Sequence, residues 1–143
     1  MSFVRVMMHA VWGTKKNEPF LTGGIRKQVI QQIEVNARAK SLYVDTLGGY
    51  IDHLHCLFGL NADISISKTL QLMKGESSFW INKEKLTKSK FEWADEYFAV
   101  SVTESMVPNV RAYILNQNEH HIKKTFKEEY DELIEKYNIR THG

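Results

Sequence analysis

The stretch that organises this chain is Tyr50-Ile51-Asp52-His53-Leu54-His55-Cys56-Leu57-Phe58, a strand-like run with two histidines one residue apart. Side chains alternate between the two faces of a strand, so His53 and His55 share one face. The residues expected on the other face, against the core, are Leu54, Cys56, Phe58 and Leu60. Two adjacent imidazoles supply half of a divalent-metal site, which needs one or two further ligands from elsewhere. Because this spacing alone is a weak signal, a purely structural histidine pair is an open alternative at this point.

Length and composition indicate a single globular domain that spans residues 1–143. The sequence has no apolar run of bilayer length, and its first residues lack the pattern of a signal peptide, so we expect a cytoplasmic protein. The single cysteine, Cys56, cannot form an internal disulfide and is interpreted as a small core residue. A formal net charge of +2 is too small to identify a nucleic-acid partner.

Hydrophobic periodicity predicts alternating strands and helices along the chain. Strands are expected over residues 3–12, 41–47, 50–58 and 97–103. Amphipathic helices are expected over residues 22–40, 65–83 and 108–121, followed by a final helix with a Thr125-x-x-Glu128 capping box. The pair Gly48-Gly49 suits a two-residue hairpin turn, in which both positions need positive φ. The order β-α-β-β-α-β with two further helices predicts an α+β, ferredoxin-like (RRM-like) antiparallel sheet.

Other polar residues are placed to join the histidine pair. In the first strand, His9 falls on the face opposite Ala10 and Trp12 and can share the sheet surface of the pair, although a lone strand histidine often has no role. In the helix over residues 108–121, Tyr113 and Gln117 are four residues apart and His120 follows, so these three side chains share one helical face.

Three blocks of the sequence resemble one known family. They are His53-Leu54-His55, Lys74-Gly75-Glu76-Ser77-Ser78-Phe79-Trp80 and Tyr113-Ile114-Leu115-Asn116-Gln117-Asn118-Glu119-His120-His121. In this order, and over nearly the whole chain, they resemble the small single-tyrosine transposases of the insertion sequence 200/605 family, which are HUH endonucleases. The resemblance implies that His53, His55 and Gln117 bind a divalent metal ion, Mg²⁺ or Mn²⁺, and that Tyr113 is the nucleophile.

These residue types suit the implied chemistry. A tyrosine hydroxyl that attacks phosphorus forms a covalent intermediate, which keeps the energy of the cut phosphodiester for rejoining, so no nucleotide cofactor is needed. A free tyrosine ionises only near pH ~10, so a nearby cation or base has to help at neutral pH. By ligand softness, two imidazoles and one amide oxygen lean towards Mn²⁺ or Zn²⁺ more than Mg²⁺.

The expected activity is the excision and integration of a mobile element as single-stranded DNA. The enzyme would bind a hairpin near each element end, cut beside it and hold a 5′-phosphotyrosine. Lysines interleaved with aromatic residues suit a groove for single-stranded nucleic acid. The candidate DNA contacts are Lys15, Lys16, Lys74, Ser77, Ser78, Lys83 and Lys85. Because two ends must be cut, a homodimer is expected, and the resemblance implies that each site combines residues of both chains.

Two other functions are compatible with the residues alone. One is a non-catalytic module that binds RNA or single-stranded DNA on the same fold. The other is a zinc hydrolase that uses His53, His55 and either His120 or His121. The spacing of Tyr113 and Gln117 favours the transposase over both.

Overall fold

The computed structural model describes residues 2–117, 121 and 123–137. The strands are β1 (Met7–Gly13), β2 (Tyr43–Tyr50), β3 (His53–Gly59) and β4 (Phe98–Val102). The helices are α1 (Gly23–Ala39), α2 (Ile66–Lys83), α3 (Val107–Leu115) and α5 (Phe126–Lys136), with single 3-10 turns η1 (Lys15–Asn17) and η2 (Glu104–Met106). The strands form one antiparallel sheet in the order β2-β3-β1-β4. The predicted ferredoxin-like fold class is therefore confirmed.

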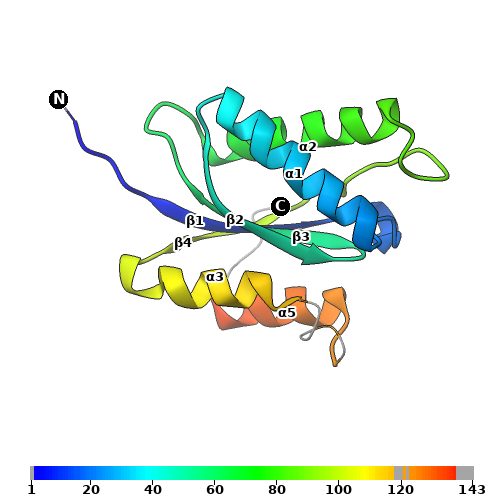
Figure 1. The fold of residues 1–143 in the computed structure, drawn as a ribbon. Coiled ribbons are helices and arrows are strands. Elements are labelled where there is room, and N and C mark those ends of the chain that lie inside the picture. Colours follow the sequence, from blue (N-terminus) through cyan, green and yellow to red (C-terminus); the bar gives the residue numbers. More distant parts are fainter. Residues whose placement is uncertain (1, 118–120, 122, 138–143) are drawn as a thin grey trace.

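Helices cover both faces of the sheet, with α1 and α2 on one face and α3 and α5 on the other (Figure 1). Alternation along β1 and β3 produces these two layers. The face under α1 and α2 buries Met8, Ala10, Trp12, Leu54, Cys56 and Phe58. The face under α3 and α5 carries Met7, His9, Val11, His53, His55 and Leu57. The histidine pair and the main core thus lie on opposite faces of β3, as predicted.

The two helices over the main core lie close to their predicted limits. Thr22, in extended conformation, precedes α1, whose buried residues are Val29, Ile33 and Ala37. Ser65 caps α2 because its hydroxyl accepts a hydrogen bond from the Lys68 amide. Among the described residues, no helix combines the length and the apolar character needed to cross a bilayer.

The first strand begins later than its predicted start at residue 3. Met7 pairs with Gly59 of β3 and with Val102 of β4, which are the last residues of those strands. The chain before Met7 therefore lies beyond the sheet, and Phe3 is 90% exposed. Alternation of side chains predicts an extended segment, but that segment becomes a strand only where a neighbouring strand pairs with it.

The pair Gly48-Gly49 lies inside β2, so the predicted hairpin turn at these glycines is wrong. β2 continues to Tyr50, and the turn to β3 is made by residues 51–52. Neither glycine has a positive φ. Close packing explains Gly48 instead, because a Cβ at this position would lie 2.6 Å from the carbonyl oxygen of Ile114 in α3. The absence of a side chain lets α3 rest directly on the sheet.

Replacing Gly48 by alanine is expected to destabilise the fold and to displace α3. The new methyl group would meet backbone atoms of Ile114, and overpacking of this kind costs about 1–3 kcal/mol. Urea unfolding measures the change. Gly75→Ala, in the interior of α2, is the matched control, because its methyl group meets nothing within 4 Å. Removing a glycine from a helix interior should raise stability by about 0.5–1 kcal/mol. Equal stability of both variants would contradict the proposed contact.

The two C-terminal helices differ in how well they match the sequence prediction. The helix predicted over residues 108–121 is interrupted, because α3 ends at Leu115 and Asn116 forms its C-cap. Asparagine competes for backbone hydrogen bonds and favours such ends. Gln117 is helical again, and its carbonyl accepts a hydrogen bond from the His121 amide over 3.0 Å. His120 lies outside the described residues. The final helix is as predicted: Thr125 and Glu128 form the reciprocal capping box that opens α5.

Candidate active site

Strand β3 presents two buried imidazoles to the layer formed by α3 and α5. His53 and His55 are both 0% exposed. Their ring centroids lie 5.2 Å apart. The predicted side-by-side arrangement of the pair is confirmed.

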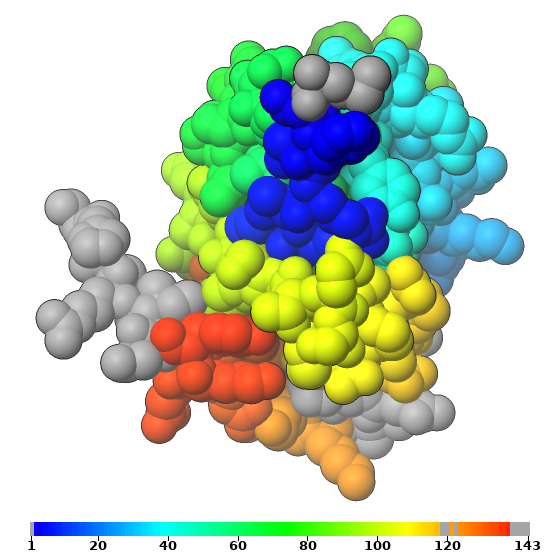
Figure 2. Space-filling view, turned by 90° about the vertical axis from the view of Figure 1, so that its left-hand side faces the viewer, coloured from blue at the N-terminus to red at the C-terminus, as the bar shows by residue number. Residues whose placement is uncertain are grey.

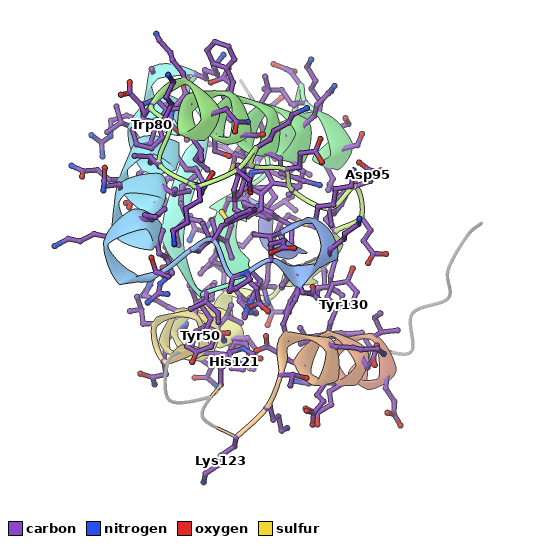
Figure 3. The ribbon with its side chains drawn as sticks, turned by 90° about the vertical axis from the view of Figure 1, so that its right-hand side faces the viewer. Tyr50, Trp80, Asp95, His121, Lys123 and Tyr130 are labelled. Atoms are coloured by element: carbon purple, nitrogen blue, oxygen red, sulfur yellow. The ribbon has the colours of Figure 1, made fainter. Side chains whose placement is uncertain are left out.

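The carboxylate of Glu129, on α5, is the shared partner of these imidazoles. Its Oε1 lies 3.3 Å from Nε2 of His53 and 3.2 Å from Nε2 of His55. The same oxygen lies 3.1 Å from Nε2 of His121, whose ring stacks on Tyr50 at 5.2 Å. Figure 3 shows Tyr50 and His121 side by side between α3 and α5. The site thus combines residues of β2 and β3, in the first half of the sequence, with residues of its C-terminal part.

Tyr113 lies on helix α3 and Gln117 lies two residues beyond its end, and both side chains join the same cluster. The Tyr113 hydroxyl donates a hydrogen bond to Oε2 of Glu129. The Gln117 amide nitrogen donates to the same oxygen over 3.2 Å. Oε1 of Gln117 lies 3.0 Å from Nε2 of His53. The four residues that the sequence singled out, Tyr113, Gln117, His53 and His55, are therefore brought together by the fold.

The outer nitrogens of both strand histidines also have partners. Nδ1 of His53 lies 2.9 Å from Oδ1 of Asp52, and Nδ1 of His55 lies 2.9 Å from Nε2 of His9. Phe126 stacks on the His53 ring, with centroids 4.1 Å apart. Such partners fix ring orientation, so that both Nε2 atoms face Glu129. His9, which the sequence placed on this surface without a role, is thus an orienting partner of His55.

Burial and hydrogen bonding set the charges of the cluster. Burial lowers the pKa of His55 to about 4 and that of His9 to about 3. Burial opposes the charge on Glu129, but hydrogen bonds from His53 and His55 outweigh it and lower the pKa of this carboxyl. Burial alone would lower the pKa of His53, yet hydrogen bonds with Asp52, Glu129 and Gln117 raise it. At neutral pH the cluster therefore holds an anionic carboxylate and a neutral His55 imidazole.

The Tyr113 hydroxyl holds its proton in this arrangement. Burial and the hydrogen bond to Glu129 both raise its pKa above the usual value. A phenol in this state donates to the carboxylate and is not yet an activated nucleophile. Ionisation requires positive charge at the cluster or transfer of the proton to a neighbouring base.

The donor atoms of the cluster fit a divalent cation. His53, His55 and Glu129 are buried, and each offers one ligand atom within 4.8 Å of the others. Two imidazole nitrogens and a carboxylate oxygen form a donor set that first-row divalent metals accept. The neutral state of His55 and the anionic state of Glu129 are those that metal ligation requires.

Glu129 is the residue of this cluster that sequence reasoning missed. Helix α5 packs on the sheet through Phe126, Tyr130 and Leu133, and Glu129 falls three residues after Phe126 and four before Leu133. These are core spacings, yet Glu129 is only 1% exposed. A carboxylate at a core position of an amphipathic helix was the available signal, because such groups are buried only with partners.

The candidate DNA contacts do not share one environment. Lys15, Lys74 and Ser78 line a cavity of about 430 Å³ that Trp93 and Tyr97 also line. Lys16, Lys83 and Lys85 are exposed. Lys74 donates hydrogen bonds to the carbonyls of residues 94 and 95, and burial lowers its pKa.

Ser77 is a structural residue, which corrects the sequence-based prediction. It is 0% exposed, donates to the Met73 carbonyl over 2.7 Å and accepts from Nε1 of Trp93 over 2.9 Å. A hydroxyl fully enclosed in this way is not accessible to DNA. Its position at core spacing in α2 is the physical reason.

Comparisons with known proteins agree with this architecture. The crystal structure of a provisionally assigned transposase from Deinococcus radiodurans R1 is similar to this structure over 81% of this chain and 93% of its own. The two sequences are 21% identical, and the TM-score is 0.66. A REP-associated tyrosine transposase, solved with a REP hairpin, is similar over 85% of this chain and 72% of its own, with 12% identity and a TM-score of 0.63. Because the two sequences are only 21% and 12% identical to this chain, the two structures support the fold and not a shared function. No curated protein sequence matches the chain significantly.

The sequence model of one family, described as "Transposase IS200 like", matches residues 2–117. The matched range includes the histidine pair, Tyr113 and Gln117. His121 also lies in the cluster, as the zinc hydrolase considered above would require. The family match decides between these functions: the chain belongs to the IS200-like transposases and is a DNA transposase.

Proposed function

We propose that this transposase cuts and rejoins single-stranded DNA through a covalent bond to Tyr113. The observation that carries the proposal is the contact of the Tyr113 hydroxyl with Glu129, whose carboxylate also meets His53 and His55. A nucleophile, a candidate base and a candidate metal site thus share one buried cluster. This combination is what phosphoryl transfer to a tyrosine requires.

In the proposed step, the Tyr113 oxygen attacks the scissile phosphorus and forms a phosphotyrosine with the 5′ end of the downstream strand. The bond from phosphorus to the 3′ oxygen breaks, and this oxygen leaves as a 3′-hydroxyl after taking up a proton. Glu129 is placed to receive the phenolic proton, because it already accepts the hydroxyl's hydrogen bond. Attack by a new 3′-hydroxyl reverses these events and rejoins DNA without a nucleotide cofactor.

We further propose that His53, His55 and Gln117 hold Mg²⁺ or Mn²⁺, with Glu129 as an additional ligand. When bound, the cation would polarise the scissile phosphate and stabilise the charge that develops on it. Asp52 and His9 keep the two imidazoles in position through their outer nitrogens. Phe126 shields His53 from water by stacking on it.

The proposed substrate is single-stranded DNA that folds into a hairpin near each element end. The similarity in fold to a transposase solved with a REP hairpin supports this choice. After the correction of Ser77, the proposed DNA contacts are Lys15, Lys16, Lys74, Ser78, Lys83 and Lys85. The proposed place of action is the cytoplasm.

The proposal is tested by a covalent-adduct assay. Wild-type protein is incubated with labelled single strands taken from the DNA that flanks its gene, with Mg²⁺ or Mn²⁺, and the products are separated under denaturing conditions. A protein–DNA adduct together with a fragment ending in a 3′-hydroxyl is expected. Cleavage without an adduct would support a metal hydrolase, and binding without cleavage would support a non-catalytic module.

We propose that two chains act together, because moving an element requires cuts at two ends. The resemblance implies a site shared between chains, but contacts within one chain favour a self-contained site. α3 is tied to β2 of its own chain by the Arg111–Asp45 pair, at 2.9 and 2.8 Å, and this guanidinium lowers the pKa of Asp45 to about 2.

A mixing experiment distinguishes these two arrangements. A heterodimer of Tyr113→Phe with His55→Ala has no intact site if each chain serves itself, so no cleavage is expected. A heterodimer of wild type with the Tyr113→Phe, His55→Ala double variant should keep about half of the activity and is the control. Differential affinity tags confirm that the chains have paired. Recovered cleavage in the first mixture would establish the shared site.

A further inference from the structure

A groove of about 320 Å³ opens between α3 and α5 and reaches the proposed nucleophile. Tyr113 and Glu129 both line it, and His9 lies among its lining residues. On the face shown in Figure 2, the yellow α3 and the red C-terminal end of α5 adjoin. A phosphate that reaches the Tyr113 hydroxyl from outside can approach through this groove.

The outer part of the groove is apolar and exposed. Met106 and Tyr137 are 45% and 42% exposed, and Val110 and Leu133 also line the groove. The Tyr137 ring packs against Phe98 of β4, with centroids 5.8 Å apart, which holds it at the mouth of the groove. An exposed aromatic ring held in this way is a surface on which a nucleic-acid base can stack.

The charged residues that line the groove are Lys136, Glu129 and Glu132, and Lys136 is the one that can meet a phosphate. Lys136 lines the groove, and its Nζ lies 5.5 Å from the centroid of the Tyr137 ring. The carboxylate of Glu132 also lines it but is paired with Lys124 over 2.6 Å. The Lys136 ammonium group lies over the Tyr137 ring, so a nucleotide that reaches the mouth meets a cation for its anionic phosphate and an aromatic ring for its flat base.

We propose that this groove binds a nucleotide joined to the scissile phosphate, with its base against Tyr137 and Met106 and its backbone beside Lys136. The inference rests on the proposed function, because it takes Tyr113 as the nucleophile. It adds a specific role for the C-terminal end of α5. That helix supplies Glu129 to the reacting atoms, and its C-cap residue Tyr137 meets the adjoining base.

The test is a coupling experiment between Tyr137 and the base. The cleavage position is first mapped with wild-type protein and single strands from the element end. Strands are then made with an abasic site at either nucleotide joined by the cut phosphate, and KM and kcat for adduct formation are measured. With wild-type protein, one of the two abasic strands should have a KM about tenfold above that of the intact strand, the size expected for a lost stacking contact.

Tyr137→Ala should raise KM for the intact strand about tenfold as well, and the abasic site should then add no further increase. Tyr137→Phe should behave as wild type, because stacking does not need the hydroxyl. Tyr43→Ala is the matched control, since Tyr43 is 51% exposed on the edge strand β2, and it should keep the full effect of the abasic site. If Tyr137→Ala fails to fold, Met106→Ala serves as the second variant, with a smaller expected rise.

The outcomes separate this inference from the proposed function. Absence of any wild-type adduct would overturn both. If wild type forms the adduct but the abasic site and the Tyr137→Ala substitution raise KM independently of each other, only the nucleotide groove is overturned. A change confined to kcat in Tyr137→Ala would also overturn it, because it would indicate a structural role.

Discussion

Tyr113→Phe is expected to eliminate the covalent protein–DNA adduct and to lower DNA cleavage by more than about 1,000-fold, as for other removed nucleophiles. The variant lacks only the oxygen that attacks phosphorus, and the ring keeps its packing beside His9 and His55. Hairpin binding should stay within about twofold of wild type, because surface contacts to DNA are unchanged. Denaturing electrophoresis measures the adduct, and a gel-shift titration measures binding.

Tyr130→Phe is the matched control for this experiment. Tyr130 lies on α5 in the same layer and packs against Phe98 and Phe126, but it is not part of the contact between Tyr113 and Glu129. This variant should form the adduct at close to the wild-type rate. An adduct that persists in Tyr113→Phe would show that another residue is the nucleophile.

His55→Ala is expected to remove metal binding together with cleavage. The substitution deletes one of the buried donors that meet at Glu129, and the affinity for Mn²⁺ measured by calorimetry should fall at least about 100-fold. Thermal unfolding gives a readout that does not depend on catalysis. Mn²⁺ at about 100 times its Kd should stabilise wild type by about 2.7 kcal/mol and should leave the variant nearly unchanged.

Two further variants should lose Mn²⁺ affinity to different extents. Glu129→Gln removes the anionic donor and should also lose most Mn²⁺ affinity. His9→Ala removes only the partner of the outer His55 nitrogen, so a smaller loss of about 10- to 100-fold is expected. The free energy of unfolding of each variant is also measured without metal, because replacing any of these buried residues lowers the stability of the fold. Wild-type Mn²⁺ affinity in both His55→Ala and Glu129→Gln would rule out this metal site.

The sequence by itself determined the features that depend on local periodicity. The alternation around His53 and His55 placed two imidazoles on one face of a strand and the core on the other, because the side-chain period of a strand is two. The capping box at Thr125 and Glu128 located the start of α5, because its hydrogen bonds join residues three apart. The order of such elements was sufficient for the ferredoxin-like sheet.

Only the tertiary structure decided the features that depend on contacts between distant segments. Gly48 and Gly49 looked like a turn, but the approach of α3 to the sheet requires Gly48 inside β2. Ser77 is among the candidate DNA contacts predicted from the sequence, but α2 packs its hydroxyl against the indole nitrogen of Trp93. Glu129 is 74 residues from His55 in the chain and meets it only when α5 docks on the sheet. Hydrophobic patterns specify which face of an element is buried, whereas the partner that a buried polar group finds there is set by how whole elements pack.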